Sequence, residues 1–160
     1  MKKIFLAALM IGLFLSCAPN DPSKENVALI ENYIEAVENL DYDAMDKILD
    51  ETYIGIGPSR NDSINKEQAI INWKNNVAHL YEKISYSRSQ NIAVKTNEGE
   101  WVSNWADLTI VYKDDQKEIS ILANTVYEIK NGKIIKSLTF YNEADALEQL
   151  GYVFINPEDL

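Results

Sequence analysis

Cysteine, histidine and basic residues are all scarce in this chain, and each scarcity limits what the protein can do. Cys17 is the one cysteine among 160 residues, so no disulfide forms within the chain. His79 is the one histidine, and it lies opposite the apolar stripe of a predicted helix, which makes it a poor candidate for a catalytic base or metal ligand. Basic residues number 15 against 25 acidic ones, a balance that counts against nucleic-acid binding.

The only long apolar run is Ile4–Leu15, which is too short to span a bilayer as a stable helix. It follows two lysines and ends at Ser16-Cys17, an arrangement that resembles a bacterial lipoprotein signal. We therefore predict a signal peptide over residues 1–16 and an acylated Cys17 that opens a tether over residues 17–24. The mature chain would then be lipid-anchored on the extracytoplasmic side of a membrane in the bacterial cell envelope. An ordinary secretory signal with an incidental cysteine is the alternative.

The first half of the remaining chain is patterned for helices. Apolar residues at three- and four-residue spacing predict helices over Glu25–Leu40 and Tyr42–Leu49, the second capped by Asp41. Thr52–Ile56 predicts a short strand, and a loop rich in turn formers follows it. A third helix opens at Asn65, and its predicted buried stripe is Ile70, Trp73, Val77, Leu80 and Tyr81.

The second half is patterned for strands. Alternation predicts a long strand from Lys83, with Ile84, Tyr86, Arg88, Gln90, Ile92 and Val94 on one face. A second strand covers Trp101–Tyr112, and a hairpin covers Ile119–Tyr141, since Asn131-Gly132 favours a type I′ turn. A short helix over Asn142–Leu150 closes the pattern. Helices followed by long strands predict an α+β fold in which one curved sheet wraps the helices.

Two polar residues on these strands bear on chemistry. Thr125 is the one distinctly polar position in the middle of an apolar strand face, so it would look into any cavity that the sheet encloses. Asp107 shares strand parity with Trp105, and a carboxylate desolvated against that indole could act as an acid or base. The opposite face of the same strand is more apolar, however, and this favours Asp107 pointing to solvent.

Two runs of the sequence resemble a known protein family. The run Ile30-Glu31-Asn32-Tyr33-Ile34-Glu35-Ala36-Val37-Glu38-Asn39-Leu40-Asp41-Tyr42-Asp43-Ala44-Met45 resembles the opening of the nuclear transport factor 2-like superfamily, SnoaL-like branch, and 131–151 resembles its end. The resemblance implies a cone-shaped barrel, or cystatin-like roll, of curved antiparallel sheet wrapped around N-terminal helices, with an apolar cavity. It assigns the domain to residues 25–151 and leaves 152–160 as a tail. Members include ketosteroid isomerases, polyketide cyclases, dehydratases, epoxide hydrolases and non-catalytic binders.

The catalytic residues of this family can be placed one by one on the chain. Tyr33 matches the helix tyrosine that serves ketosteroid isomerases as an oxyanion donor. The general base of those enzymes falls at Ile56 or at a glycine beside it, and their second acid falls at Thr125. The His and Asp of SnoaL-type cyclases fall at Ser137 and Thr139. None of these replacements can hold a proton near neutral pH, so we expect the known chemistries of the fold to be absent.

Three functional hypotheses remain. The first is a non-catalytic lipoprotein domain that binds a small apolar ligand in a pocket of aromatic and hydroxyl side chains. The pocket residues predicted are Tyr33, Tyr53, Trp73, Trp105, Thr125, Tyr127, Ser137, Thr139 and Tyr141. The second is an isomerase- or cyclase-like enzyme that uses Tyr33 and Asp107. The third is an envelope protein that dimerises through the outer sheet face at Leu138 and Phe140. No motif implies a metal or a cofactor.

Overall fold

The computed structural model describes residues 22–156 and 158. The predicted signal peptide and Cys17, with the tether as far as residue 21, lie outside the described residues. In chain order the elements are α2 (Pro22–Glu38), α3 (Tyr42–Ile48), β1 (Leu49–Ile56), β2 (Ser63–Asn65), α4 (Lys66–His79), β3 (Tyr81–Lys95), β4 (Glu100–Tyr112), β5 (Glu118–Lys130), β6 (Lys133–Tyr141) and α5 (Glu143–Gln149).

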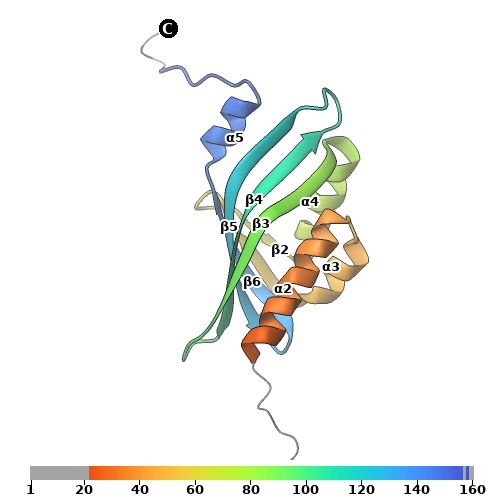
Figure 1. Ribbon diagram of the computed structural model, residues 1–160, viewed down its shortest axis with the longest axis vertical. Helices are drawn as coiled ribbons and strands as arrows, with labels where there is room; N and C mark the ends of the chain where they lie inside the picture. Colours follow the sequence, from red (N-terminus) through yellow and green to blue (C-terminus); the bar gives the residue numbers. More distant parts are fainter. Residues whose placement is uncertain (1–21, 157, 159–160) are drawn as a thin grey trace, which may run out of the picture.

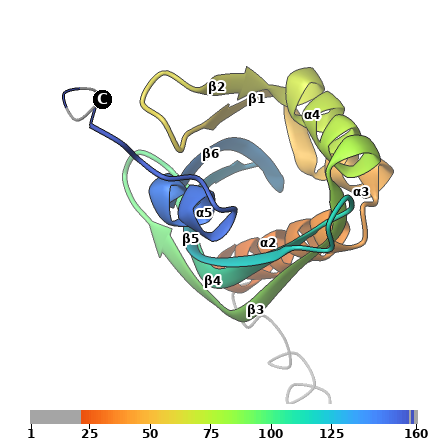
Figure 2. The same cartoon turned by 90° about the horizontal axis from the view of Figure 1, so that it is seen from above.

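The strands form one curved sheet in the order β2-β1-β6-β5-β4-β3, which wraps around α2, α3 and α4 without closing into a barrel (Figures 1 and 2). The α+β class and the wrapped helices are therefore confirmed. The sheet is not wholly antiparallel, because β1 pairs parallel with β6. Parallel partners need a long crossover, and here the chain from α4 to β5 supplies it. A local sequence pattern carries no sign of a pairing between strands so far apart.

The helices α3 and α4 begin at the cap residues that the sequence predicts. The side chain of Asp41 accepts a hydrogen bond from the backbone N–H of Ala44 at the start of α3. Asn65 and Gln68 form a reciprocal capping box at the start of α4. The helix predicted from Glu25 begins three residues earlier, so residues 22–24 belong to α2 and not to a tether. Proline is tolerated in the first turn of a helix, which is why this start is compatible with Pro22.

Two strand predictions needed correction. Ser63 and Ile64, predicted as loop, form β2 together with Asn65, the predicted start of the third helix, because this segment pairs antiparallel with the edge of β1. The single face predicted from Ile84 to Val94 is wrong, because the register of β3 against β4 shifts between Ser87 and Gln90. Arg88 takes a positive φ of 52° at this β-bulge. The extra residue exchanges the two faces, so Ile84 lies on the concave side of the sheet and Val94 on the convex side.

The hydrophobic core lies between α2, α3, α4 and the concave side of the sheet. Its fully buried side chains include Ile30, Met45, Leu49, Val102 and Ile134. All members of this core and the apolar residues packed against it fall between Val27 and Ile134. The chain from Ala18 onward therefore carries its own core and is expected to fold without the segment before it. None of the helices in the described part of the chain is long and apolar enough to cross a membrane.

Candidate functional site

The concave face of the sheet is set by strand pairing. Cross-strand partners point to the same side, so the pairs between β4, β5 and β6 define rows of side chains across the face. One row consists of Ala93, Val102, Tyr127 and Ser137, in which Ala93 is half-buried and the other three are buried. The next consists of Asn91, Asn104, Thr125 and Thr139. We call this second set the polar row, since every member carries an amide or a hydroxyl.

The polar row is tied together by its own hydrogen bonds. The amide of Asn104 donates to Ser89 Oγ at 2.7 Å and to Asn91 Oδ1 at 3.0 Å. The hydroxyls of Thr125 and Thr139 lie 3.2 Å apart across β5 and β6. Asn104 is buried, with 3% of its surface exposed. Buried polar groups are stable only when paired, so these bonds allow a polar belt inside an apolar face.

Part of this face retains contact with solvent. Leu108, Thr125, Thr139 and Tyr141 are half-buried, whereas Val102 and Tyr127 towards one end of the face and Ile119 towards the other are buried. We call these four half-buried residues the inner patch. Its backing is apolar, from Ala106, Ile121 and Ala123. The inner patch therefore offers an apolar surface with two threonine hydroxyls and one phenol, which is the composition of a small-molecule site.

Tyrosines fill the space between α2 and the sheet. The hydroxyl of Tyr53 shares a 2.6 Å hydrogen bond with Ser137 Oγ, and the rings of Tyr33 and Tyr127 meet edge to face at 6.0 Å. The Tyr33 hydroxyl is within hydrogen-bonding reach of Trp73 on α4, and that of Tyr127 is within reach of Thr125. This cluster packs the middle of the domain with neutral hydroxyl groups.

Burial keeps these phenols protonated. Desolvation, with smaller repulsion from neighbouring tyrosines, raises the pKa of Tyr33 and of Tyr127 well above its usual value near 10. Desolvation, with a smaller contribution from Glu38, raises the pKa of Tyr86 to about 12. At neutral pH such groups can donate or accept hydrogen bonds but cannot take a proton as a base.

Eight of the nine predicted pocket residues lie on the inner side of the sheet or face it from a helix. Trp105 does not, and its placement in the pocket was wrong. It pairs with Gln90 and Asn124, which puts its indole on the convex side. The pairing of Tyr33 with Asp107 in one enzyme site is wrong for the same reason. Asp107 is cross-strand to Leu122 on the convex side, where the Arg88 guanidinium binds its carboxylate, so the sheet lies between Asp107 and Tyr33.

Asn104 and Asn91 were not among the residues predicted for the pocket. Asn104 shares strand parity with Val102 and Ala106, the more apolar face of β4, and an amide in such a run is a signal that could have been used. Asn91 could not be placed from parity, because the bulge in β3 exchanges the faces before it.

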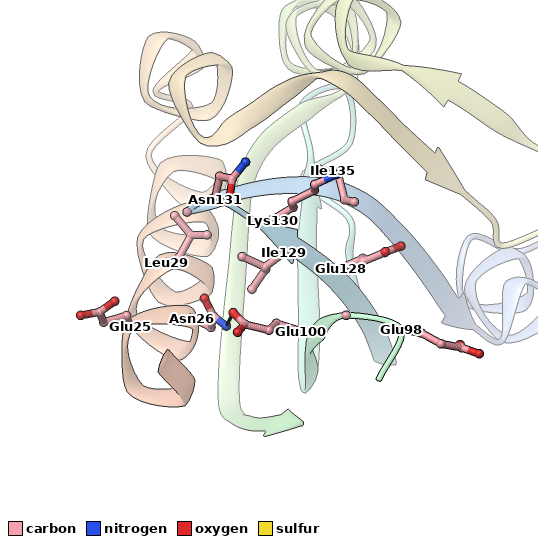
Figure 3. Close-up of a pocket in the computed structure, with 12 residues that line it drawn as sticks. Glu25, Asn26, Leu29, Glu98, Glu100, Glu128, Ile129, Lys130, Asn131 and Ile135 are labelled. Atoms are coloured by element: carbon pink, nitrogen blue, oxygen red, sulfur yellow. Dashed lines mark hydrogen bonds between the residues drawn. The ribbon is translucent and has the colours of Figure 1, made fainter. Parts of the chain in front are cut away.

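The structure also holds a groove of about 620 Å³ at the end of the domain where the β3–β4 and β5–β6 turns lie. Residues of α2 and of these two turns line it (Figure 3). Leu29, Ile129 and Ile135 form its apolar part. Among its carboxylates, Glu100 accepts hydrogen bonds from Asn26 and Lys95, which together lower the pKa of that carboxyl, and Glu128 pairs with Lys136. These charges are compensated within the chain. No residue predicted for the pocket lines this groove.

The family model for the SnoaL-like domain matches residues 27–133. The chain belongs to this family. The match covers α2 through the β5–β6 turn, so it includes most of the polar row and all of the tyrosine cluster described above. No curated protein matches the chain.

Solved structures with the same fold share little sequence with this SnoaL-like domain. A proposed polyketide cyclase from Xanthomonas campestris pv. campestris superposes with a TM-score of 0.67 at 15% identity, over 80% of this chain and 98% of that one. A proposed SnoaL-like polyketide cyclase from Shewanella denitrificans OS-217 gives 0.65 at 13%, over 79% and 96%. An epoxide hydrolase from M. tuberculosis, described as LEH-like, gives 0.64 at 12%, over 81% and 91%. At such identities the likeness establishes the nuclear transport factor 2-like fold alone.

The tyrosine cluster predicts a specific loss of stability at alkaline pH. Above pH 10 the tyrosines of the unfolded chain lose their protons while Tyr33, Tyr86 and Tyr127 keep theirs, so the unfolded state binds fewer protons and the folded state loses its advantage. Each of them lowers the unfolding free energy by up to about 1.4 kcal/mol per pH unit between pH 10 and its own folded pKa.

Urea unfolding at a series of pH values from 8 to 12 measures this loss as a slope. In Tyr127→Phe the slope above pH 10 should fall by about one proton. An unchanged slope in Tyr127→Phe would contradict the buried, protonated state of this residue.

Proposed function

We propose that this SnoaL-like domain binds a small, uncharged and mostly apolar molecule on the inner patch without transforming it. The observation that carries the proposal is the polar row inside an apolar face. Thr125 and Thr139 place two hydroxyls side by side, and both stay half-buried. Tyr141 supplies aromatic surface in the adjacent row, and Leu108 supplies apolar surface one row further along the face. A ligand with one carbonyl or hydroxyl could exchange the Thr125–Thr139 bond for bonds to itself and cover the apolar surface with the rest of its skeleton.

The charge of the site supports an uncharged ligand. From Val102 to Tyr112, Ile119 to Tyr127 and Ser137 to Tyr141, the inward positions of the described strands β4, β5 and β6 carry apolar, amide and hydroxyl side chains, with no carboxylate, imidazole or lysine. An ion placed against these strands would lose its hydration without gaining a partner charge from them. The carboxylate of Glu38, which α2 brings to β3, accepts a hydrogen bond from the backbone N–H of Tyr86. A neutral ligand therefore suits β4, β5 and β6 best.

The same inventory supports binding without catalysis. General acid–base chemistry needs a group that can exchange a proton near neutral pH. The phenols of this face have raised pKa values, and Asp107 is on the other side of the sheet. The isomerase base was expected at Ile56 or at a glycine beside it. Ile56 is cross-strand to Leu138 on the convex side, and Gly55 and Gly57 have no side chain that could serve as a base. We therefore propose neither the cyclase nor the hydrolase activity that is named for the similar structures.

We propose in addition that the domain is held at the cell envelope by a lipid on Cys17. The chain enters α2 at the end of the domain where the β3–β4 and β5–β6 turns lie, and α5 lies at the other end (Figure 1). Cys17 precedes Pro22 by five residues, so a lipid there would hold the turn end near the membrane and direct the α5 end away from it.

Lipid attachment is tested by labelling. Full-length chain expressed in a bacterium should incorporate a labelled fatty acid and sediment with membranes, and Cys17→Ser should do neither while the protein is still made. Equal labelling of Cys17→Ser, or a parent chain released without lipid, would overturn the anchor and leave an ordinary secretory signal.

Ligand binding is tested by thermal unfolding of the chain from Ala18 onward against a panel of neutral polycyclic, steroid-like and aromatic compounds. Ligand at a hundred times its dissociation constant adds about 2.7 kcal/mol, which corresponds to a rise of roughly 5–10 °C in Tm for a domain of this size. Thr125→Phe should abolish the shift because the new ring fills the inner patch, whereas Thr109→Phe, on the convex side of β4, should keep it.

Two further readouts decide between the hypotheses. Ile135→Trp fills the groove at the turn end, and binding to the inner patch predicts that this variant keeps the shift. A shift lost in Ile135→Trp and kept in Thr125→Phe would move the site to the groove. A compound that shifts Tm and is consumed over hours by the parent chain would contradict binding without catalysis.

A further inference from the structure

The side-chain amide of Asn104 has its hydrogen bonds on one side only. Asn104 lies on the concave side of β4, with 3% of its surface exposed. Its amide nitrogen donates to Ser89 Oγ at 2.7 Å and to Asn91 Oδ1 at 3.0 Å. A weaker contact of 3.4 Å joins the same nitrogen to the backbone carbonyl of Gln90. All three acceptors belong to β3, close to the bulge, so the nitrogen fastens this part of β3 to β4.

The carbonyl of Gln90 determines which end of the Asn104 amide is the nitrogen. A backbone carbonyl can only accept, so the NH₂ group points toward β3 and the oxygen Oδ1 points away from it. No residue in the described part of the chain donates a hydrogen bond to Oδ1. Within residues 22–156 and 158, every side-chain oxygen that is sealed from solvent has a partner, so Oδ1 keeps a contact with solvent. Asn104 therefore presents an acceptor without a donor at the concave face.

The inner patch begins directly beside this acceptor. Thr125 is the cross-strand partner of Asn104 on β5, and its hydroxyl lies 3.2 Å from that of Thr139. The Cβ atoms of cross-strand partners are about 4.5–5.5 Å apart, and two hydrogen bonds to one shared oxygen span about 5.5 Å. One ligand oxygen placed between Asn104 and Thr125 can therefore bond to both side chains at once.

We infer that the ligand of the inner patch bears a hydroxyl group, which donates its hydrogen to Asn104 Oδ1 and accepts one from the Thr125 hydroxyl. The inference rests on the proposed function, because it concerns the same site, and it narrows the neutral ligands to alcohols and phenols. A ketone of the same skeleton is disfavoured. Its oxygen accepts from Thr125, but it places a second acceptor against Oδ1 and leaves that oxygen without a donor.

The discrimination arises from desolvation of the amide oxygen. A ligand that covers the inner patch removes Oδ1 from water, and an acceptor that is buried without a partner costs more than one hydrogen bond gains. A site with a buried polar group rejects an analogue that cannot pair with it more strongly than an apolar site rejects a change of shape. Asn104 is therefore the residue that determines specificity in this site.

The first test offers each neutral skeleton of the compound panel as an alcohol and as its ketone, for example fluorenol with fluorenone and menthol with menthone. Isothermal titration calorimetry of the chain from Ala18 onward should give a dissociation constant at least about tenfold lower for the alcohol. A ketone that binds as tightly as its alcohol would overturn the inference and leave ligand binding intact. Binding of no compound at all would overturn the proposed function, and the inference with it.

The second test removes the acceptor. Asn104→Leu has a similar volume and no Oδ1, so the preference for fluorenol over fluorenone should fall below about twofold. The control is Asn124→Leu on the convex side of β5, where the amide donates to Ser103 Oγ and to the backbone carbonyl of Asn104. This variant should keep the parent's preference. A folded Asn104→Leu chain with the parent's preference would mean that Asn104 only ties β3 to β4.

Asn104→Leu also loses its bonds to β3, so a measurement on the parent chain accompanies it. The side-chain NH₂ signals of Asn104 in a ¹⁵N-labelled chain report on Oδ1, because a hydrogen bond to the oxygen polarises the whole amide. Saturation with fluorenol should move these signals, and saturation with fluorenone should move them much less. Equal movement with both compounds, or none with a bound alcohol, would overturn the inference.

Discussion

The alternation of side chains along β5, and its register with β4 and β6, is the constraint on which the rest of the structure depends. A side chain two residues further along a strand returns to the same side of the sheet, and pairing transmits that choice to each neighbour. Asn104 and Thr139 are cross-strand partners of Thr125, so all three side chains lie on the concave side. Asp107 is the partner of Leu122, and both lie on the convex side. A slip of one residue would exchange the polar row for exposed apolar groups and bury the ion pairs.

This constraint divides the chemistry of the molecule between two faces. The concave side holds neutral hydroxyls and amides, and burial raises the pKa values of its tyrosines. The convex side holds the compensated ion pairs and exposed apolar side chains such as Leu122 and Phe140.

Features that depend on a few adjacent residues could be predicted from the sequence. The Asn131-Gly132 turn has positive φ at both residues, Asp41 and Asn65 cap the helices as expected, and Thr125 points inward. Most of the pocket residues were found because strand parity extends over β5 and β6 without interruption as far as Glu128.

Features that depend on pairing between distant segments could not be predicted in the same way. The bulge at Arg88 breaks parity within β3, and only the register against β4 reveals it. Trp105 was misplaced because an aromatic residue suggests an interior, although its parity with Asp107 already pointed outward. The groove of α2 and two turns joins residues about a hundred positions apart, and no local pattern indicates it.

The central claim is that the inner patch, and not the groove at the turn end, is where this domain holds a ligand. It is tested most directly by mapping backbone amide chemical shifts in a ¹⁵N-labelled chain from Ala18 onward during titration with a compound that raises its Tm. The account predicts the largest changes at Asn104, Thr125 and Thr139, with Gly99 and Asn131 unmoved. Changes that gather at Gly99 and Asn131 and leave Thr125 unmoved would contradict it.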